Sequence, residues 1–303
     1  MNLSNKQLTT VPEEVFGQKG IEELWLDDNK IIEIPENFSQ LTHLKKLSLY
    51  KNYLSGLPES LFQMIGLELL NVSANKLSLL SNNIENLQRL QILDIQHNKI
   101  NMLPNTIGNL KNLRFLYLGG NLLEILPSSL QNLKNIIYLN IAYNKFTQLP
   151  ECIGNLENLI ELRIYNNEIR NLPSFIGSLK KLKELHAMNN QINVLSEEAC
   201  NLGNLQKLML ENNNLEMLPG NIDKLQNLTE LNLRANQLTC LPQTIGNLKK
   251  LRFLDLRDNK LTFLPETILE LVNLEKLDVR LNKNLIIPSW LVELEKRGCI
   301  VYN

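Results

Sequence analysis

Apolar and polar positions follow one pattern along this chain, and the pattern recurs every 23 residues. An asparagine marks each copy, and around it the apolar positions lie at −8, −5, −3, +2, +5, +9 and +12, as in the copy centred on Asn259. The repeated asparagines are Asn29, Asn52, Asn75, Asn98, Asn121, Asn144, Asn167, Asn190, Asn213, Asn236, Asn259 and Asn282. A fixed period without a slip indicates that one structural unit is repeated along the whole chain.

Each copy contains one short strand and a long return. The positions at −5 and −3 are apolar and flank a variable residue, which is the alternation of a β-strand. Because all copies run in the same direction, we predict that the strands stack in parallel about 4.8 Å apart, with the returns as the opposite wall. The coil is right-handed, and its stacked leucines form a core that no single copy could bury alone.

The repeated asparagine lies between apolar positions, where an amide is costly to bury unless its donors and acceptor are paired. Where a strand turns out of the sheet, backbone groups lose their partners. We therefore predict a structural asparagine ladder, in which each amide binds its own turn and the turn of the adjacent repeat. All 11 prolines lie at +6, which suits the start of a helical turn, so we expect short 3₁₀ or α turns in the return wall.

The pattern LxxLxLxxNxLxxLPxxIxxLxx resembles the leucine-rich repeat family over nearly the whole chain. Its Leu-Pro pair and 23-residue period are similar to the subclass found in Ras-associated intracellular scaffolds and in repeat proteins of pathogenic bacteria. The resemblance implies an α/β solenoid, a right-handed horseshoe with a parallel sheet on the concave side and 3₁₀ or α turns on the convex side. It also implies protein binding on the concave face, as in intracellular scaffolding or in contact between a bacterium and its host.

We expect a single leucine-rich repeat domain over residues 1–303. Residues 1–20 form an incomplete first repeat, because Lys6 stands where the first asparagine is expected. Residues 21–282 form the regular repeats, and residues 283–303 form a C-terminal cap with a helical turn that begins near Trp290 and a last strand at 300–302. The incomplete first repeat leaves a core edge uncovered, which predicts either further sequence upstream or end-to-end self-association.

Composition and charge narrow the function classes. The chain holds 66 Leu and 43 Asn, and repetition explains this excess. The repeats fill the chain, so we expect no appended catalytic domain. With 31 basic and 32 acidic residues the net charge is −1, so no overall field attracts nucleic acid or an anionic membrane, and recognition by charge has to be local. We expect neither nucleic-acid binding nor membrane insertion. Residues 1–10 carry no secretory signal, and the sequence leaves the compartment open: we expect a soluble chain that is secreted or on the cell surface if a signal peptide was removed, and cytoplasmic otherwise.

The residues that commonly carry catalysis or bind metals lie apart in the pattern. The cysteines and histidines are Cys152, Cys200, Cys240, Cys299, His43, His97 and His186. Successive cysteines are about two repeats, or about 10 Å, apart, which is beyond the reach of a disulfide. The histidines fall in separate repeats, so neither a zinc cluster nor a Cys-His pair is predicted. We expect no enzymatic activity, no metal and no cofactor.

Positions −6, −4 and −2 alternate with the buried leucines, so their side chains should point out of the sheet on its concave side. Aromatic residues, His and Met gather there across five adjacent repeats as Phe115, Tyr117, Tyr138, Tyr165, His186, Met188 and Met209. Exposed aromatics and Met at this density are typical of an interface hot spot. The alternative is that the rings stack across strands and only stiffen the sheet.

Two further columns are candidates for contacts. Arg234, Arg257 and Arg280 occupy position −2 of three successive repeats, beside Asp255 and Asp278. They form either a surface ion-pair ladder or an anchor for an acidic patch on a partner, since Arg pairs with carboxylates in bidentate geometry.

The other column is position +4, with Leu79, Met102, Ile125, Val194, Met217, Cys240, Phe263 and Ile286. We expect partly buried packing for this apolar stripe rather than a lateral docking edge.

The sequence therefore favours a non-catalytic protein-protein interaction module that binds a macromolecular partner on its concave face. The alternative is recognition of a carbohydrate or cell-wall glycan by the same aromatic residues, because sugars bind to flat exposed rings. A structural role through end-to-end self-association is the third hypothesis.

Overall fold

The computed structural model describes residues 1–18 and 20–303. The chain divides into two compact units, 1–145 and 146–303, and each is described by itself. The prediction of a single domain over 1–303 stays a prediction.

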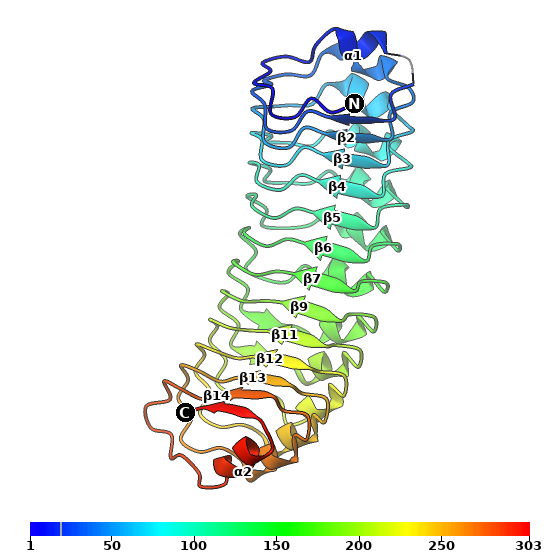
Figure 1. Ribbon diagram of the computed structural model, residues 1–303. Helices are drawn as coiled ribbons and strands as arrows, with labels where there is room; N and C mark the ends of the chain where they lie inside the picture. The colour runs from blue at the N-terminus through cyan, green and yellow to red at the C-terminus, as the bar shows by residue number, and fades with distance from the viewer. Residues whose placement is uncertain (19) are drawn as a thin grey trace. The chain divides into compact units, whose positions relative to one another are not determined.

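The first unit alternates short strands with short 3₁₀ turns (η), and a single turn of α-helix comes before them (Figure 1). Its elements are α1 (Glu14–Gly17), β1 (Glu23–Trp25), η1 (Glu36–Gln40), β2 (Lys46–Ser48), η2 (Glu59–Gln63), β3 (Leu69–Asn71), η3 (Asn82–Asn86), β4 (Ile92–Asp94), η4 (Asn105–Asn109), β5 (Phe115–Tyr117), η5 (Ser128–Asn132) and β6 (Tyr138–Asn140). The strands therefore recur with the period of the sequence pattern.

The second unit continues the alternation and ends with a helix and a strand. Its elements are η6 (Glu151–Asn155), β7 (Glu161–Arg163), β8 (Asn171–Leu172), η7 (Ser174–Ser178), β9 (Glu184–His186), β10 (Val194–Leu195), η8 (Glu197–Asn201), β11 (Lys207–Met209), η9 (Ile222–Lys224), β12 (Glu230–Asn232), η10 (Gln243–Asn247), β13 (Phe253–Asp255), η11 (Glu266–Glu270), β14 (Lys276–Asp278), α2 (Leu291–Lys296) and β15 (Ile300–Tyr302). Two of these strands, β8 and β10, pair with each other in a small separate parallel sheet.

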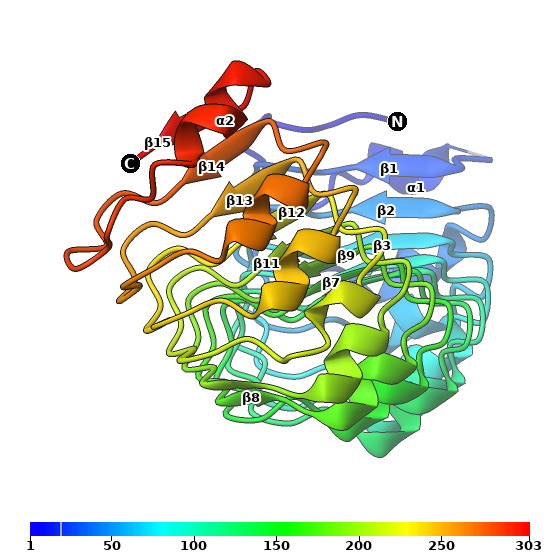
Figure 2. The same cartoon turned by 90° about the horizontal axis from the view of Figure 1, so that it is seen from below.

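Within each unit, neighbouring strands of the main sheet are parallel and pair at the repeat spacing. Leu70 of β3 lies opposite Leu93 of β4 in the first unit, and Leu231 of β12 lies opposite Leu254 of β13 in the second. The 3₁₀ turns form the wall opposite the sheet (Figure 2). The predicted fold class, a right-handed α/β solenoid with a parallel sheet and 3₁₀ turns, is confirmed.

The core consists of the apolar positions of the pattern. The inward leucines of the strands are inaccessible to solvent in both units, as at Leu70 and Leu254. Large aromatic side chains fill the first unit at Phe38 and Phe62 and the second at Phe146. Since every repeat contributes the same inward positions, stacking gives one continuous apolar core in each unit.

The repeated asparagines connect each repeat to the preceding one. The Asn236 amide nitrogen Nδ2 donates to the carbonyls of Leu233 (3.0 Å) and Arg234 (3.2 Å) in its own turn, and to that of Leu210 (2.9 Å) in the preceding repeat. Its Oδ1 accepts from the backbone N–H of Leu215 at 3.0 Å. One side chain therefore pairs four backbone groups that the end of the strand leaves without ladder partners.

The residue before the asparagine has a left-handed backbone. Its φ is 53° at Ala235 and 63° at Leu281, and non-glycine residues adopt this conformation in most repeats. A left-handed residue with a Cβ costs about 1 to 2 kcal/mol. The side-chain bonds of the adjacent asparagine help to hold this strained turn.

Proline takes a slightly different place from the predicted one. It lies at the N-cap of the 3₁₀ turn, with the extended backbone of Pro35 (φ −72°, ψ 151°) as an example, and not at the first helical position. Its carbonyl accepts the first bond of the turn, from Phe38 N–H at 3.1 Å. Where serine replaces proline, the hydroxyl caps the turn: Ser81 Oγ accepts from Asn83 N–H at 3.1 Å, and Ser196 Oγ accepts from Ala199 N–H at 3.3 Å.

Glycine allows the 3₁₀ turns of adjacent repeats to approach closely. A Cβ on Gly246 would lie 2.2 Å from the carbonyl oxygen of Thr267 in the next turn, and one on Gly108 would lie 2.3 Å from that of Ser129. Such distances are far inside van der Waals contact. At Gly108 and Gly246 only glycine therefore allows the turns of this wall to stack so closely.

The apolar core is covered to different extents at the two ends of the chain. At the N-terminus, Asn2 forms a bridge with Trp25, and Leu3 and Leu8 are only half-buried. At the C-terminus, Leu291 and Leu294 of α2 are buried, and β15 pairs with β14. The helix and the strand expected in the C-terminal segment are therefore present.

Replacing Asn236 with Ala should lower the free energy of unfolding by about 1 to 3 kcal/mol, because four buried backbone groups lose their partner. The matched control is Asn214→Ala, which removes an exposed asparagine of the preceding repeat and should change stability by less than about 0.5 kcal/mol. Urea denaturation followed by circular dichroism measures both. Equal stabilities for the two variants would contradict a structural role for the ladder.

Gly246→Ala should lower the free energy of unfolding by about 1 to 3 kcal/mol, since the new methyl group forces two turns apart. Gly203→Ala is the control, because a Cβ there meets nothing within 4 Å. It should be neutral or slightly stabilising. The same denaturation experiment compares them, and a Gly246→Ala variant as stable as Gly203→Ala would show that the turns can separate without cost.

Candidate functional site

The outer face of the first unit's sheet carries an apolar row at position −6. Its members are Leu69, Ile92, Phe115 and Tyr138, which lie opposite one another on the adjacent strands β3 to β6. All four are half-buried. We call these four residues the apolar row.

One aromatic contact links the row to position −4, and another lies within the row. The rings of Tyr117 and Tyr138 are 4.7 Å apart between centroids, and those of Phe115 and Tyr138 are 6.4 Å apart. The rings therefore do stack across strands, as the stiffening alternative requires. They nevertheless keep part of their surface in solvent.

A polar group borders the aromatic residues on the same face. Asp94, which lies opposite Tyr117, accepts hydrogen bonds from the backbone and the side chain of Gln96. Because Gly119 has no side chain, Gln96 reaches past it and accepts from Asn140 Nδ2 at 3.1 Å. Burial raises the pKa of Asp94, and the hydrogen bonds from Gln96 offset this only in part.

In the second unit, the predicted residues Tyr165, His186, Met188 and Met209 are also half-buried. A charged cluster surrounds His186. Its Nε2 lies 3.0 Å from Glu184 Oε2 and 3.9 Å from Glu161 Oε1, and the potential ligand atoms of the three side chains lie within 4.8 Å of one another.

Cations already pair with both carboxylates of this cluster. Arg163 Nε lies 2.6 Å from Glu161, and Lys207 Nζ lies 3.0 Å from Glu184. Burial alone would raise the pKa of Glu184, but hydrogen bonds from His186 and Lys207 outweigh it and keep that pKa low. The arrangement is an ion-pair network that needs no metal ion to balance its charge.

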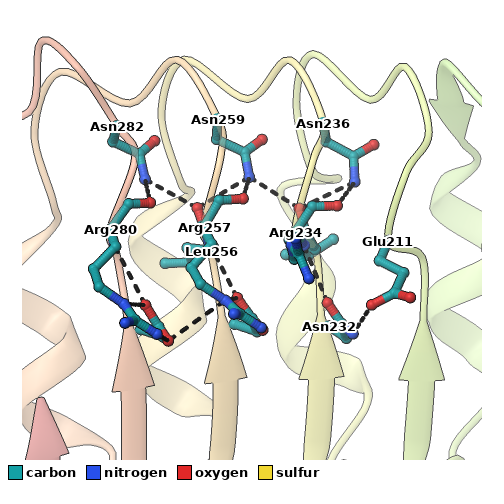
Figure 3. Close-up of polar contacts among 12 residues, drawn as sticks. Glu211, Asn232, Arg234, Asn236, Leu256, Arg257, Asn259, Arg280 and Asn282 are labelled. Atoms are coloured by element: carbon teal, nitrogen blue, oxygen red, sulfur yellow. Dashed lines mark hydrogen bonds and ion pairs between the residues drawn. The ribbon is translucent and has the colours of Figure 1, made fainter. Parts of the chain in front are cut away.

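The arginine column differs from one member to the next (Figure 3). Arg257 pairs with Asp255 at 2.5 Å and with Asp278 at 3.4 Å, and Arg280 pairs with Asp278 at 2.7 Å. Arg280 also lies over the ring of Tyr302, 4.6 Å from its centroid. These two guanidinium groups therefore already have carboxylate partners.

Asp278 is the most enclosed charge of the column, with no solvent-accessible surface. Burial favours its protonated form, but hydrogen bonds from Arg280 and the charges of Arg280 and Arg257 hold its pKa below the ordinary value. Its strand lies beside the C-terminal strand, where Tyr302 is its register partner.

Arg234 is exposed, and among the described residues its side chain makes no ion pair. Position −4 of the same repeat is Asn232, whose amide donates to Glu211 at 2.7 Å (Figure 3). The guanidinium of Arg234 therefore has no carboxylate partner at this position. Of the three predicted arginines, Arg234 is therefore the one that a partner's acid could reach without displacing an existing bond.

The expectation for position +4 is wrong. Leu79, Met102 and Ile125 of the first unit are 64%, 65% and 65% exposed, and Met217 of the second is 67% exposed. Val194, Phe263 and Ile286 are exposed as well, and only Cys240 is intermediate. Positions +2 and +5 of the same segment enter the core, so the side chain at +4 projects from the flank.

Burial sets the chemistry of most of the cysteines. All four are free thiols, and Cys152, Cys200 and Cys299 are buried. Burial raises the pKa of Cys152 to about 11 and that of Cys200 to about 12. At neutral pH these two remain protonated, which is typical of structural thiols.

Comparison with known proteins identifies the family. A family model described as leucine rich repeat matches residues 42–100, 180–238 and 227–286. A second leucine rich repeat model matches residues 112–133 and 135–156. The chain belongs to the leucine-rich repeat family. A search of curated proteins gives no match.

Solved leucine-rich repeat structures are similar over almost the whole chain. A leucine-rich repeat protein of Leptospira interrogans is 37% identical with a TM-score of 0.93, over 98% of this chain and 76% of that one. The ectodomain of the receptor kinase GASSHO1/SCHENGEN3 from Arabidopsis thaliana, in complex with CASPARIAN STRIP INTEGRITY FACTOR 2, is 31% identical with a TM-score of 0.79, over 95% and 36%.

The complex of TLR13 with ssRNA13 is 30% identical with a TM-score of 0.80, over 96% of this chain and 44% of that one. The present chain thus spans less than half the length of each of these two chains. None of the helices among the described residues of the leucine-rich repeat chain is long and apolar enough to cross a membrane.

Two parts of the site escaped the sequence analysis. Leu69 and Ile92 extend the row of Phe115 and Tyr138, and reading position −6 down the repeats would have found them. The cluster of Glu161, Glu184 and His186 was missed because only Cys and His were considered as metal ligands. Carboxylates at −6 beside a histidine at −4 are the signal for it.

Asp278→Asn should lower the free energy of unfolding at neutral pH by about 1 to 2 kcal/mol, because two guanidinium groups lose their carboxylate. A lowered folded-state pKa contributes stability above the unfolded value of about 3.9, and this is lost as the pH falls through the folded value. The difference from the wild type should therefore shrink below about pH 4. Asp258→Asn, an exposed control, should show no such difference in urea denaturation at either pH.

Proposed function

We propose that this chain is a non-catalytic protein-interaction module whose partner binds the outer face of the first unit's sheet. The observation that carries the proposal is the apolar row. Apolar side chains on four successive strands face away from the core and retain contact with solvent. Solved relatives of the family include a receptor ectodomain in complex with a named factor.

The energetics favour a contact at this row. Covering an apolar side chain that is still half-exposed contributes about 25 cal/mol per Å², and aromatic residues in a rigid setting lose little conformational entropy on binding. The ring contacts between Tyr117 and Tyr138 pre-organise this surface. Stiffening and binding therefore support each other here.

The half-buried residues of the second unit extend the proposal. Tyr165, His186, Met188 and Met209 would add contacts on the outer face of that unit's sheet, and exposed Arg234 would receive a carboxylate from the partner. Arg257 and Arg280 contribute less, because they are already paired with Asp255 and Asp278.

Nucleic acid fits this face poorly. Of the outward positions on β1 to β6, Lys46 supplies the positive charge, and it pairs with Glu23 at 2.8 Å. Binding to phosphates requires several cations that are free to neutralise them. The ssRNA of the TLR13 complex therefore gives no guide to the ligand of this surface.

Ile92→Asp should weaken partner binding by about 10- to 100-fold, because it places a charge in the middle of the apolar row. Met102→Asp is the matched control, because it makes the same kind of change in the same unit but on the flank of the sheet. It should keep the wild-type Kd. The partner is captured on the wild-type chain, purified and titrated against each variant by biolayer interferometry, with circular dichroism as the folding check.

The double change Tyr117→Ala and Tyr165→Ala should abolish the same binding. Undiminished binding of the partner by both outer-face variants would move the site elsewhere. If the wild-type chain binds a glycan array and Tyr117→Ala removes that binding, the ligand is a carbohydrate and the proposal fails.

A further inference from the structure

One flank of the first unit combines protruding apolar side chains with lysines. The segment that follows each ladder asparagine turns from the sheet toward the 3₁₀ wall. Its position +4 carries Leu79, Met102 and Ile125, and its position +1 carries Lys30, Lys76 and Lys99. We call these six residues the lysine-apolar flank.

Local structure makes both positions point outward. Positions +2 and +5 enter the core, as at Leu77 and Leu80, which are buried. The side chains at +1 and +4 lie on the other side of the same segment, where all six members of the lysine-apolar flank are exposed. The three apolar members expose about two thirds of their surface, at 64%, 65% and 65%.

The lysines of this flank are available for a ligand. Among the described residues, Lys30, Lys76 and Lys99 make no ion pair. Lys76 lies over the ring of Tyr53, 4.7 Å from its centroid, at the same +1 position. Tyr53 and Leu122 occupy the same column as these lysines and are themselves exposed.

Carboxylates on this face do not cancel the lysines. Asp28 is paired with Lys51 at 2.9 Å. Glu33 and Glu124 are the other acids of positions −1 to +4 in this unit, and both are exposed and make no ion pair with a described residue. Positive charge is therefore in local excess, although the net charge of the whole chain is −1.

We propose that the lysine-apolar flank docks onto the surface of an anionic lipid bilayer. Leu79, Met102 and Ile125 enter the boundary between headgroups and acyl chains, while the lysines contact lipid phosphates and carboxylates. Apolar insertion and attraction to anionic lipid are the two contributions that together hold a peripheral protein on a membrane. Neither contribution alone gives stable binding.

The arrangement favours a lipid surface over a protein. The apolar side chains protrude one per repeat in a row along the flank, and most of the surface of each is exposed to solvent. A protein partner would need a complementary pocket for each of them, whereas fluid lipid adapts to any protruding side chain. The charge of the lysines complements phosphatidylserine headgroups at the same depth.

The second unit provides an internal comparison. Met217 has the same position, +4, as Met102 and a similar exposure, 67% against 65%. The +1 positions around it are Gln191, Asn214 and Gln237, which carry no charge. Around Met217 the apolar stripe therefore lacks lysines, although Lys260 and Lys283 occupy position +1 beside Phe263 and Ile286 farther along the same unit.

The test is co-sedimentation of the full chain with phosphatidylcholine vesicles, with and without phosphatidylserine. Binding is expected only with phosphatidylserine, and it should weaken as salt is added. Met102→Asp should reduce the vesicle partition coefficient about tenfold or more. Lys76→Glu with Lys99→Glu should reduce it at least about fivefold for each lysine. Thermal unfolding checks that each variant folds.

Met217→Asp should leave vesicle binding at the wild-type value, and Ile92→Asp should do the same, which separates this proposal from the partner site on the sheet. Equal binding to both vesicle types, no binding to either, or an equal loss with Met217→Asp would overturn the proposal. Binding to a soluble acidic protein or RNA that the lysine variants abolish, in the absence of vesicle binding, would assign the flank to that ligand instead.

Discussion

The structure depends on how the backbone is satisfied where each strand leaves the sheet. At that point N–H and C=O groups turn into an apolar core in which water cannot pair them. One asparagine side chain pairs four of these groups, two in its own turn and two in the preceding repeat, as Asn236 shows. Because each asparagine bonds backbone groups at fixed places in the preceding repeat, the ladder holds neighbouring repeats in register.

A fixed register places equivalent positions of successive repeats in straight columns, and each column can acquire its own chemistry. Position −6 is apolar across β3 to β6, whereas position −2 is basic across β12 to β14. Apolar residues at position +4 are exposed in both units, and the neighbouring position +1 is lysine at Lys76 and Lys99 but uncharged around Met217. The core constrains none of these columns, because they alternate with inward positions. Binding surfaces can therefore differ between units while the backbone stays the same.

The sequence predicts the fold well because period and phase decide it. An asparagine every 23 residues between leucines specifies parallel strands and a return wall. The burial of a side chain is harder to predict. Met102 and Phe263 are apolar, and only the path of the chain shows that they protrude into solvent. The reverse holds for Asp278, an outward position that its ion pairs and neighbouring strands enclose. The Glu184–His186 contact depends on side-chain reach, which a spacing pattern does not encode.

The arginine column shows why burial decides what a repeated charge can do. A partner carboxylate that approached Arg280 would compete with Asp278, whose charge is fully enclosed. Leaving that carboxylate unpaired costs more than a new exposed ion pair contributes. Arg257 is held in the same way by two carboxylates. Arg234 makes no ion pair with any described residue, so among these chemically identical side chains the one whose neighbour is an amide is the candidate for binding an acidic group.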